Sequence, residues 1–328
     1  MFSRIYKKQN IIVKFILKIF NLYAYDKETL NMVNPSYKNV GKNLIRLNDK
    51  SFNLSKGYLK LDRKIKKLDI FYRYSPNNNL WNSSKNWKRI IPNIDKRTLI
   101  SVSLTSLKES ILFFLEKNNL EINLNLISDN SDEKFDIHIG KLLVSEKFKT
   151  HKYNTKIKGN RGSYLECCDK AMNSEDLIFF IEDDYLFEKN CIDEMIFTYS
   201  RLSTILGKDI IMCPSDYPFY YDSLYNTNLY FGKNLRWRNV EETLLTFLFS
   251  KKILLQNLNS FRKVGKQENN PFEKPLHQIY KEIPCLAPIT SLSYHIGRDN
   301  PSLNEDYLSL WNINLNIYNN LNLSSDHS

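Results

Sequence analysis

The run 177–181 is apolar throughout and is followed at once by three acidic residues, Glu182, Asp183 and Asp184. Its side chains are mostly branched or aromatic and no polar residue interrupts them, which is typical of a strand buried on both faces of a sheet. Such a strand needs helices on both sides, so it favours an α/β fold. Ligands of open α/β sheets bind at the carboxyl ends of the strands, where these carboxylates would lie.

Two interpretations of the acidic cluster are open from this pattern. Adjacent carboxylates repel one another unless a cation lies between them, and a divalent metal ion is a common partner of such a group. The alternative is a solvated acidic turn before a helix predicted over 188–202, where acidic residues favour the N-terminal dipole.

Other predicted elements alternate along the chain around this strand. The periodicity predicts strands over 68–74, 121–127 and 210–213, and helices over 97–117 and 162–172, with a basic loop over 150–161. The order strand, helix, strand, helix, strand is typical of a largely parallel central sheet flanked by helices.

Residues 1–65 differ from the rest of the chain, because they are basic, rich in Asn and only patchily apolar. We therefore predict an N-terminal extension over 1–65 and one domain over 66–328.

The apolar run 11–20 contains two lysines and is either a basic amphipathic helix apposed to an anionic membrane or a helix packed on the body of the protein. A membrane-spanning helix would need about 18 apolar residues, and no run reaches that length. The two lysines also argue against a signal peptide.

The charge balance favours anionic partners. The chain has 47 basic and 36 acidic residues, a formal net charge of +11. Nucleotide diphosphates and acidic lipid headgroups fit this charge, whereas no finger spacing or RNA-binding aromatic motif accompanies it, so we expect no nucleic-acid partner. The five cysteines show no paired spacing, which suits a reducing compartment and predicts a cytoplasmic protein.

Short motifs follow the predicted strands in a recognisable order. They are 128–132 (Ser-Asp-Asn-Ser-Asp), the loop 159–162 (Gly-Asn-Arg-Gly) and 182–186 (Glu-Asp-Asp-Tyr-Leu). In this order they resemble the family 2-type glycosyltransferases with the GT-A fold, over residues 66–300. The late segment 288–295 (Pro-Ile-Thr-Ser-Leu-Ser-Tyr-His) is similar to the ending of a bacterial subgroup with the Glu-Asp-Asp-Tyr-Leu motif.

The resemblance implies a role for several of these residues. Asp129 would hydrogen-bond the base, usually uracil, and Asp183 would face the ribose. Asp184 would ligate Mn²⁺ or Mg²⁺, and His295 would complete the metal shell. Ser128 departs from the family pattern, because it stands where the first acid of a pair usually is.

Two more assignments concern the nucleotide and the acceptor. Arg73, at the end of the first predicted strand, is assigned to nucleotide binding. An inverting transferase needs a carboxylate that deprotonates the acceptor hydroxyl. The resemblance assigns this base to Glu268, with Glu273 and Asp216 in reserve. Glu268 could instead be a surface acid at the start of a helix predicted over 272–280. Asp216 could instead stabilise a turn or contact the acceptor sugar.

The predicted function is therefore a metal-dependent glycosyltransferase, inverting in mechanism. It would move a sugar from a nucleotide-sugar donor, with a UDP-sugar favoured, to a glycan or lipid-linked acceptor in surface polysaccharide biosynthesis. The predicted location is the cytoplasm, with peripheral contact to the inner face of the membrane.

Two rival functions are kept. One is a non-catalytic, degenerate GT-A domain that binds a nucleotide sugar or glycan. The other is a nucleotidyltransferase, which would be expected to carry a Gly-rich phosphate loop after the first strand, and 74–77 (Tyr-Ser-Pro-Asn) is not one.

Overall fold

The computed structural model describes residues 30–32, 46–48, 51–53, 61–77, 91, 94–221, 227–296 and 306–325. The predicted amphipathic segment 11–20 lies outside these residues, and the division of the chain at residue 65 stays a prediction. Arg63, on the N-terminal side of that division, forms ion pairs with Asp176 and Asp209.

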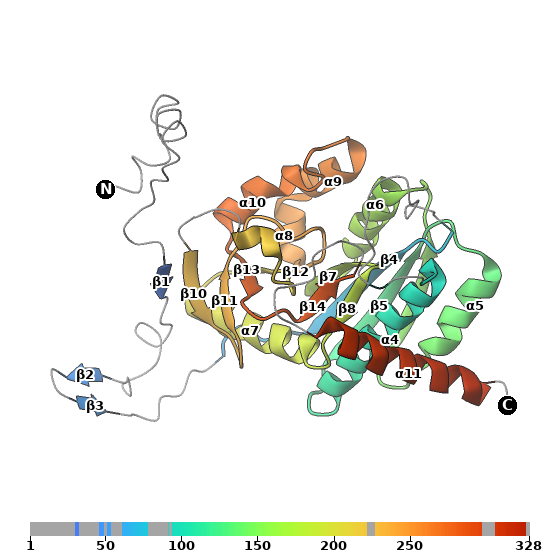
Figure 1. The fold of residues 1–328 in the computed structure, drawn as a ribbon. Coiled ribbons are helices and arrows are strands. Elements are labelled where there is room, and N and C mark those ends of the chain that lie inside the picture. The colour runs from blue at the N-terminus through green and yellow to red at the C-terminus, as the bar shows by residue number, and fades with distance from the viewer. Residues whose placement is uncertain are drawn as a thin grey trace, which may run out of the picture.

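A ten-stranded sheet runs through the described part of the chain in the order β1-β10-β11-β13-β9-β12-β7-β4-β5-β6 (Figure 1). Its parallel core contains β4 (Lys67–Tyr74), β5 (Glu121–Ser128), β6 (Lys149–Asn154) and β7 (Leu177–Glu182). These bounds confirm the predicted strands at 68–74, 121–127 and 177–181.

The other half of the sheet is mixed. There β12 is antiparallel to both β7 and β9, β13 is parallel to β9, and β10 and β11 form an antiparallel pair. The strands here are β1 (Leu30–Met32), β9 (Ile211–Met212), β10 (Thr227–Phe231), β11 (Arg236–Asn239), β12 (Phe247–Ser250) and β13 (Cys285–Pro288). Two small sheets pair β8 (Tyr185–Phe187) with β14 (Ser293–His295) and β2 (Arg46–Asn48) with β3 (Ser51–Asn53).

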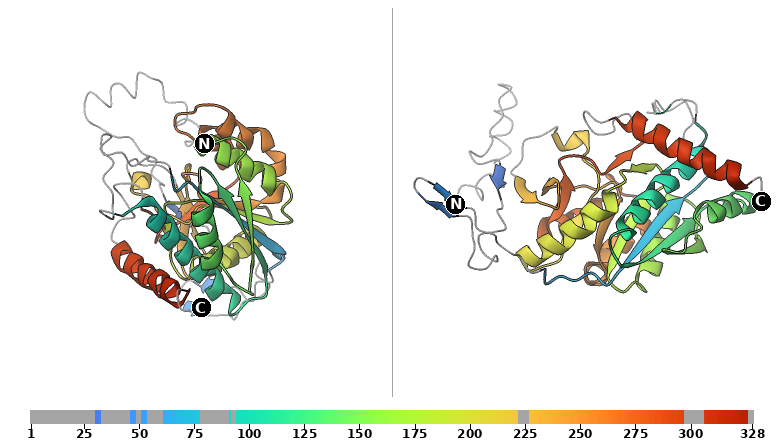
Figure 2. Two further views of the ribbon diagram at one scale, coloured as in Figure 1. Left: turned by 90° about the vertical axis from the view of Figure 1, so that its right-hand side faces the viewer. Right: turned by 90° about the horizontal axis from the view of Figure 1, so that it is seen from below.

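Helices cover the two faces of the sheet. On one face α4 packs against α5, α7 and α11, and on the other α6 packs against α9 (Figures 1 and 2). The helices are α4 (Lys96–Leu115), α5 (Glu133–Leu142), α6 (Asn160–Ala171), α7 (Cys191–Leu206), α8 (Lys251–Gln256), α9 (Leu258–Lys266), α10 (His277–Glu282) and α11 (Tyr307–Ser325), with 3₁₀ turns η2 (Pro218–Tyr221) and η3 (Lys274–Leu276). This arrangement confirms the predicted α/β fold class.

Helix α4 is the central helix of its layer. Asp95 caps its N-terminus, because the Asp95 carboxylate accepts hydrogen bonds from the backbone N–H groups of Arg97 and Thr98. Among the described helices, α4 alone is long and apolar enough to cross a membrane, and most of it is buried inside the protein. The core helix of a globular domain has the same length and composition, so the burial accounts for its apolar sequence.

The middle of the core is aromatic. Phe180 on β7 is fully buried, and its ring centroid lies 5.8 Å from that of Phe71, 5.8 Å from that of Tyr164 and 5.0 Å from that of Phe249. These rings come from two neighbouring strands and one helix, so β7 is enclosed on its flanks and faces as its sequence predicts.

Two local predictions are wrong. The segment predicted as a basic loop contains the strand β6, whose exposed position at the sheet edge explains its polar sequence. The helix predicted over 272–280 is a 3₁₀ turn followed by the short α10, because Pro275 disfavours α-helical dihedral angles at Lys274. Residues 241–246 form a loop in which Leu244 and Leu245 have positive φ.

His138 connects three helices of one layer. Its Nε2 atom lies 3.2 Å from the hydroxyl oxygen of Tyr318 on α11 and 3.4 Å from Oγ of Ser101 on α4. Burial lowers the pKa of His138, and the nearby charge of Lys141 lowers it further. The neutral imidazole is therefore the form that the folded protein favours.

We predict that this contact makes the protein less stable in acid. The folded pKa lies below the unfolded value of about 6.5, so the unfolded chain binds the proton more readily and stability falls as the pH drops below that value. The thermal midpoint should drop more between about pH 7.5 and about pH 5 in the parent than in His138→Gln. The exposed His151 gives a control, since His151→Gln should keep the parental slope. Identical slopes for the parent and His138→Gln would contradict the prediction.

Candidate functional site at the carboxyl ends of the strands

The ends of β4, β5 and β7 meet through one serine. Ser75 follows β4, and its backbone N–H donates to Oδ2 of Asp183 at 2.8 Å. Its hydroxyl lies 3.5 Å from Oδ2 of Asp129, which follows β5. Two acidic residues predicted to lie at one edge of the sheet therefore do so, although their roles in nucleotide binding stay predictions.

Asp129 also holds the loop between β6 and α6. Its buried carboxylate accepts hydrogen bonds from the backbone N–H of Gly159 at 3.0 Å and from Oγ1 of Thr155 at 3.2 Å. Gly159 has φ +93°, a conformation that L side chains rarely adopt, and a Cβ on Gly162 would lie 1.8 Å from the carbonyl oxygen of Ile157. Both glycines of the predicted loop motif are thus required by backbone geometry.

Arg73 and Glu182 form a buried ion pair across neighbouring strands. They stand opposite each other in the β4–β7 register, and the guanidinium contacts the Glu182 carboxylate. The guanidinium also donates to Oδ1 of Asn160 at 2.6 Å. Arg73 is only 4% exposed, so protein groups already compensate its charge, and its predicted role in nucleotide binding has no direct support in this geometry.

Asp183 has a cationic partner that sequence reasoning missed. Nζ of Lys96, the first residue of α4, lies 2.8 Å from Oδ1 of Asp183, and both side chains are 12% exposed. Burial raises the pKa of Asp183 and the ammonium opposes that rise. Nothing in the sequence distinguishes Lys96 from any other lysine at a helix start.

Asp184 and His295 are in direct contact although 111 residues separate them. Antiparallel pairing of β8 with β14 places His295 opposite Tyr185, and the two rings are 4.9 Å apart. Nε2 of His295 lies 2.9 Å from Oδ2 of Asp184. Burial opposes ionisation of this carboxyl, but the imidazole holds the pKa of Asp184 at about 2. The two predicted metal ligands are therefore brought together.

The donor set at this point suits a divalent metal ion. Arg73 and Lys96 compensate the other two carboxylates, while Oδ1 of Asp184 is buried and has no hydrogen-bond partner in the described part of the chain. A buried acceptor without a partner is costly, and a cation would satisfy it. An imidazole nitrogen with a carboxylate oxygen is a ligand pair suited to Mn²⁺ more than to Mg²⁺, which prefers oxygen alone.

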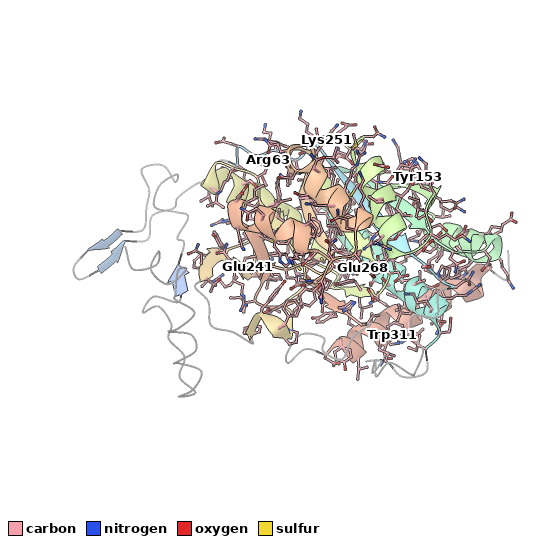
Figure 3. All side chains as sticks on the ribbon, turned by 90° about the horizontal axis from the view of Figure 1, so that it is seen from above. Arg63, Tyr153, Glu241, Lys251, Glu268 and Trp311 are labelled. Carbon is pink, nitrogen blue, oxygen red and sulfur yellow. The ribbon has the colours of Figure 1, made fainter. Side chains whose placement is uncertain are left out.

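The three candidates for the catalytic base have different surroundings. Glu268 is exposed on the loop between α9 and η3 (Figure 3). Asp216 is buried and accepts a hydrogen bond from the Tyr221 hydroxyl at 2.6 Å. Glu273 is buried, which raises its pKa to about 7, and it accepts hydrogen bonds from Thr243. The geometry leaves Glu268 the most accessible of the three.

The loop before β12 lies at the same edge of the sheet as the acidic cluster. The backbone N–H of Glu182 donates to Oγ1 of Thr246 at 3.4 Å. The hydroxyls of Tyr185 and Tyr217 are hydrogen-bonded, and Tyr217 donates to the carbonyl of Thr243 at 3.2 Å. Residues 240–246, called the β11–β12 loop below, therefore border the acidic cluster.

Comparison with known proteins gives weak similarities. No family model matches the chain, and no curated protein matches its sequence. Similar solved structures include S. aureus TarS 1–349, with 10% identity and a TM-score of 0.40 over 67% of this chain and 57% of TarS 1–349. The glycosyltransferase GlyE of Streptococcus pneumoniae TIGR4 has 10% identity and a TM-score of 0.40 over 78% of this chain and 63% of GlyE.

A third similar structure is the bifunctional glycosyltransferase WbbM, with 8% identity and a TM-score of 0.40 over 81% of this chain and 52% of WbbM. The chain spans less than two thirds of the length of each of these three structures. At these scores the similarities carry no argument about activity, and the function has to be argued from the site itself.

The Lys96–Asp183 pair predicts a clear effect on stability. Lys96→Met removes the cation and leaves the Asp183 carboxylate buried without its charge partner. We expect the free energy of unfolding to fall by about 3 kcal/mol in urea denaturation. As a control, Arg262→Met breaks an exposed pair with Asp169 and should leave the stability nearly unchanged. Equal stability of Lys96→Met and the parent would show that the pair is not needed.

Proposed function

We propose that this chain is a metal-dependent glycosyltransferase, inverting in mechanism. It would move a sugar from a nucleotide-sugar donor, with a UDP-sugar favoured, to a glycan or lipid-linked acceptor. The observation that carries this proposal is the buried Asp184–His295 pair at the carboxyl-end edge of the sheet, with Oδ1 of Asp184 lacking a partner among the described residues. That donor set lies where α/β sheets bind nucleotides.

In this proposal Asp184 and His295 hold a divalent ion, Mn²⁺ in preference to Mg²⁺. When bound, such an ion neutralises a diphosphate and stabilises it as a leaving group. Asp183 and Asp129 lie beside the pair, joined by Ser75, and we assign them to the ribose and the base. Lys96 and Gly159 keep these two carboxylates in place, so the nucleoside would meet preorganised acceptors.

Glu268 is proposed as the general base. A base has to come within hydrogen-bond reach of the acceptor hydroxyl, and Glu268 is exposed. Glu273 is less suited, because its carboxylate is occupied by the N–H groups of Thr243, Leu244 and Leu245. Asp216 lies beside Tyr221, and contact with the acceptor sugar is the role we assign to it.

The cellular setting follows from the same proposal. A lipid-linked acceptor and a nucleotide-sugar donor meet at the inner face of a membrane, and a net charge of +11 favours an anionic surface. We therefore propose a cytoplasmic protein with peripheral membrane contact that serves surface polysaccharide biosynthesis.

The donor site is tested by thermal unfolding with nucleoside diphosphates, each with and without Mn²⁺. With Mn²⁺ present, UDP at a concentration a hundred times its dissociation constant should stabilise the folded parent protein by about 2.7 kcal/mol. UDP without Mn²⁺, or Mn²⁺ without UDP, should give no such stabilisation. Asp184→Asn should abolish the shift, because it removes a charged ligand. Asp169→Asn changes an exposed acid in an ion pair on the outer surface and should keep the shift.

Two results of this experiment would contradict the proposal. If no nucleoside diphosphate changes the midpoint with or without Mn²⁺, the donor site is absent. If the shift survives Asp184→Asn, the metal is held elsewhere.

The general base is tested by steady-state kinetics with a donor that stabilises the protein. Glu268→Gln keeps the side-chain shape but cannot accept the proton, so kcat should fall about 10²–10⁴-fold with little change in donor KM. Glu268→Asp should recover part of the loss. If Glu268→Gln retains the parental kcat, the base is another residue. If the parent binds donor but transfers no sugar to any acceptor, the non-catalytic alternative is favoured.

A further inference from the structure

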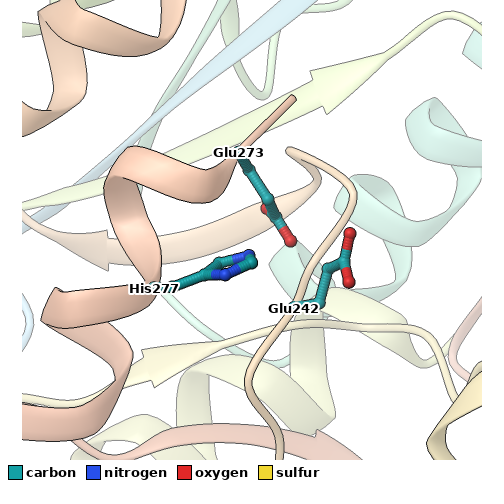
Figure 4. Close-up of side chains that lie close together, drawn as sticks. All are labelled: Glu242, Glu273 and His277. Atoms are coloured by element: carbon teal, nitrogen blue, oxygen red, sulfur yellow. The ribbon is translucent and has the colours of Figure 1, made fainter. Parts of the chain in front are cut away.

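Three metal-binding side chains converge beside the β11–β12 loop, outside the Asp184–His295 pair. Glu242 comes from the loop, Glu273 immediately precedes η3, and His277 begins α10. One ligand atom from each lies within 4.8 Å of the other two, and Figure 4 shows the three side chains lying close together. We call these residues the Glu-Glu-His cluster.

The order of these residues along the chain explains the convergence. Glu273 immediately precedes the 3₁₀ turn η3 and His277 immediately follows it, so one short turn separates the two residues. Glu242 approaches from the opposite side, because the loop is anchored to Glu273 through Thr243. The cluster therefore spans two segments about thirty residues apart that the fold brings together.

His277 supplies an imidazole nitrogen without a partner. Its Nε2 atom is buried and has no hydrogen-bond partner in the part of the chain that the structure describes. A buried ring nitrogen without a partner, beside two carboxylates, is a place where a cation could bind.

Glu273 is held in a fixed orientation by five hydrogen-bond contacts. Thr243 supplies two short hydrogen bonds, one from its backbone N–H and one from its hydroxyl at 2.8 Å. The contacts with Leu244 N–H, Leu245 N–H and the Tyr280 hydroxyl are longer, at 3.2, 3.3 and 3.4 Å. A carboxylate has about four lone-pair positions, so a metal ion bound to Glu273 would replace one or more of the longer contacts. Bonds of this kind orient the ligands of protein metal sites.

We propose that Glu242, Glu273 and His277 form a metal site for Zn²⁺ or a similar transition-metal ion, separate from the Asp184–His295 pair. One imidazole nitrogen with two carboxylate oxygens matches Zn²⁺, which accepts both ligand types and leaves a fourth position for water. The two carboxylates repel one another, and a dication between them removes that repulsion. Mg²⁺, which prefers oxygen ligands and its own waters, fits this set less well.

An ion in the Glu-Glu-His cluster would tie the β11–β12 loop to α10. The same loop contacts the backbone of Glu182 through Thr246. The metal would thus stabilise one wall of the candidate donor site without taking part in the chemistry there. This proposal does not depend on the identity of the sugar or on glycosyl transfer at all.

The test is Zn²⁺ binding to the tag-free full chain, measured by isothermal titration and by metal analysis after dialysis. It is done in the parent and in Asp184→Asn, which removes a ligand of the other site. We expect about one Zn²⁺ per chain to persist in Asp184→Asn, as a single tetrahedral site would hold. His277→Ala and Glu242→Gln, each in that background, should weaken this binding at least about tenfold.

The controls separate a specific site from surface binding and from misfolding. His151→Ala removes an exposed histidine on β6 and should leave Zn²⁺ binding unchanged. Glu273 is not used, because its loss would release the β11–β12 loop, and circular dichroism checks that each variant is folded. Binding that survives both His277→Ala and Glu242→Gln, or no Zn²⁺ binding in Asp184→Asn, would overturn the proposal. Neither result would affect the UDP and Mn²⁺ test, which depends on Asp184.

Discussion

The partial burial of three adjacent carboxylates at the end of β7 is the constraint on which the site depends. Like charges this close are tolerated away from water only if each has a compensating partner. The partners come from three different elements: Arg73 on β4, Lys96 at the start of α4 and His295 on β14. The acidic strand end therefore determines how a neighbouring strand, a helix and the late strand β14 must dock.

The three pairs differ in a way that bears on function. Arg73 and Lys96 are cations that neutralise the negative charges of Glu182 and Asp183. These two carboxylates therefore stabilise the fold, whether or not they also bind a ligand. The pair with His295 leaves one Asp184 oxygen buried without a partner among the described residues. A single unmet acceptor in an otherwise compensated cluster is a more specific indication of a cation than the count of acids in the sequence.

The features of the site that could be predicted follow from the hydrophobic pattern of single strands. The features that could not be predicted depend on how distant segments pack together. The apolar run of β7 and the alternation in β4 and β5 were enough to place Asp129 and Asp183 at one edge, because parallel strands end together. Family resemblance, not periodicity, connected Asp184 with His295. The edge strand β6 was missed because its side chains face solvent, and the β11–β12 loop was missed because a distant buried glutamate holds its positive-φ residues.

The sequence by itself determined the class of fold, the strand whose end carries the acids, and the glycine positions that the loop geometry requires. These features depend on short-range periodicity and backbone conformation, which a few consecutive residues encode. Only the tertiary structure decided the partner of each carboxylate and the convergence of the Glu-Glu-His cluster. Lys96 lies far in sequence from Asp183, and Glu242 lies far from Glu273 and His277. Contacts of that kind are set by how helices and loops pack on the sheet.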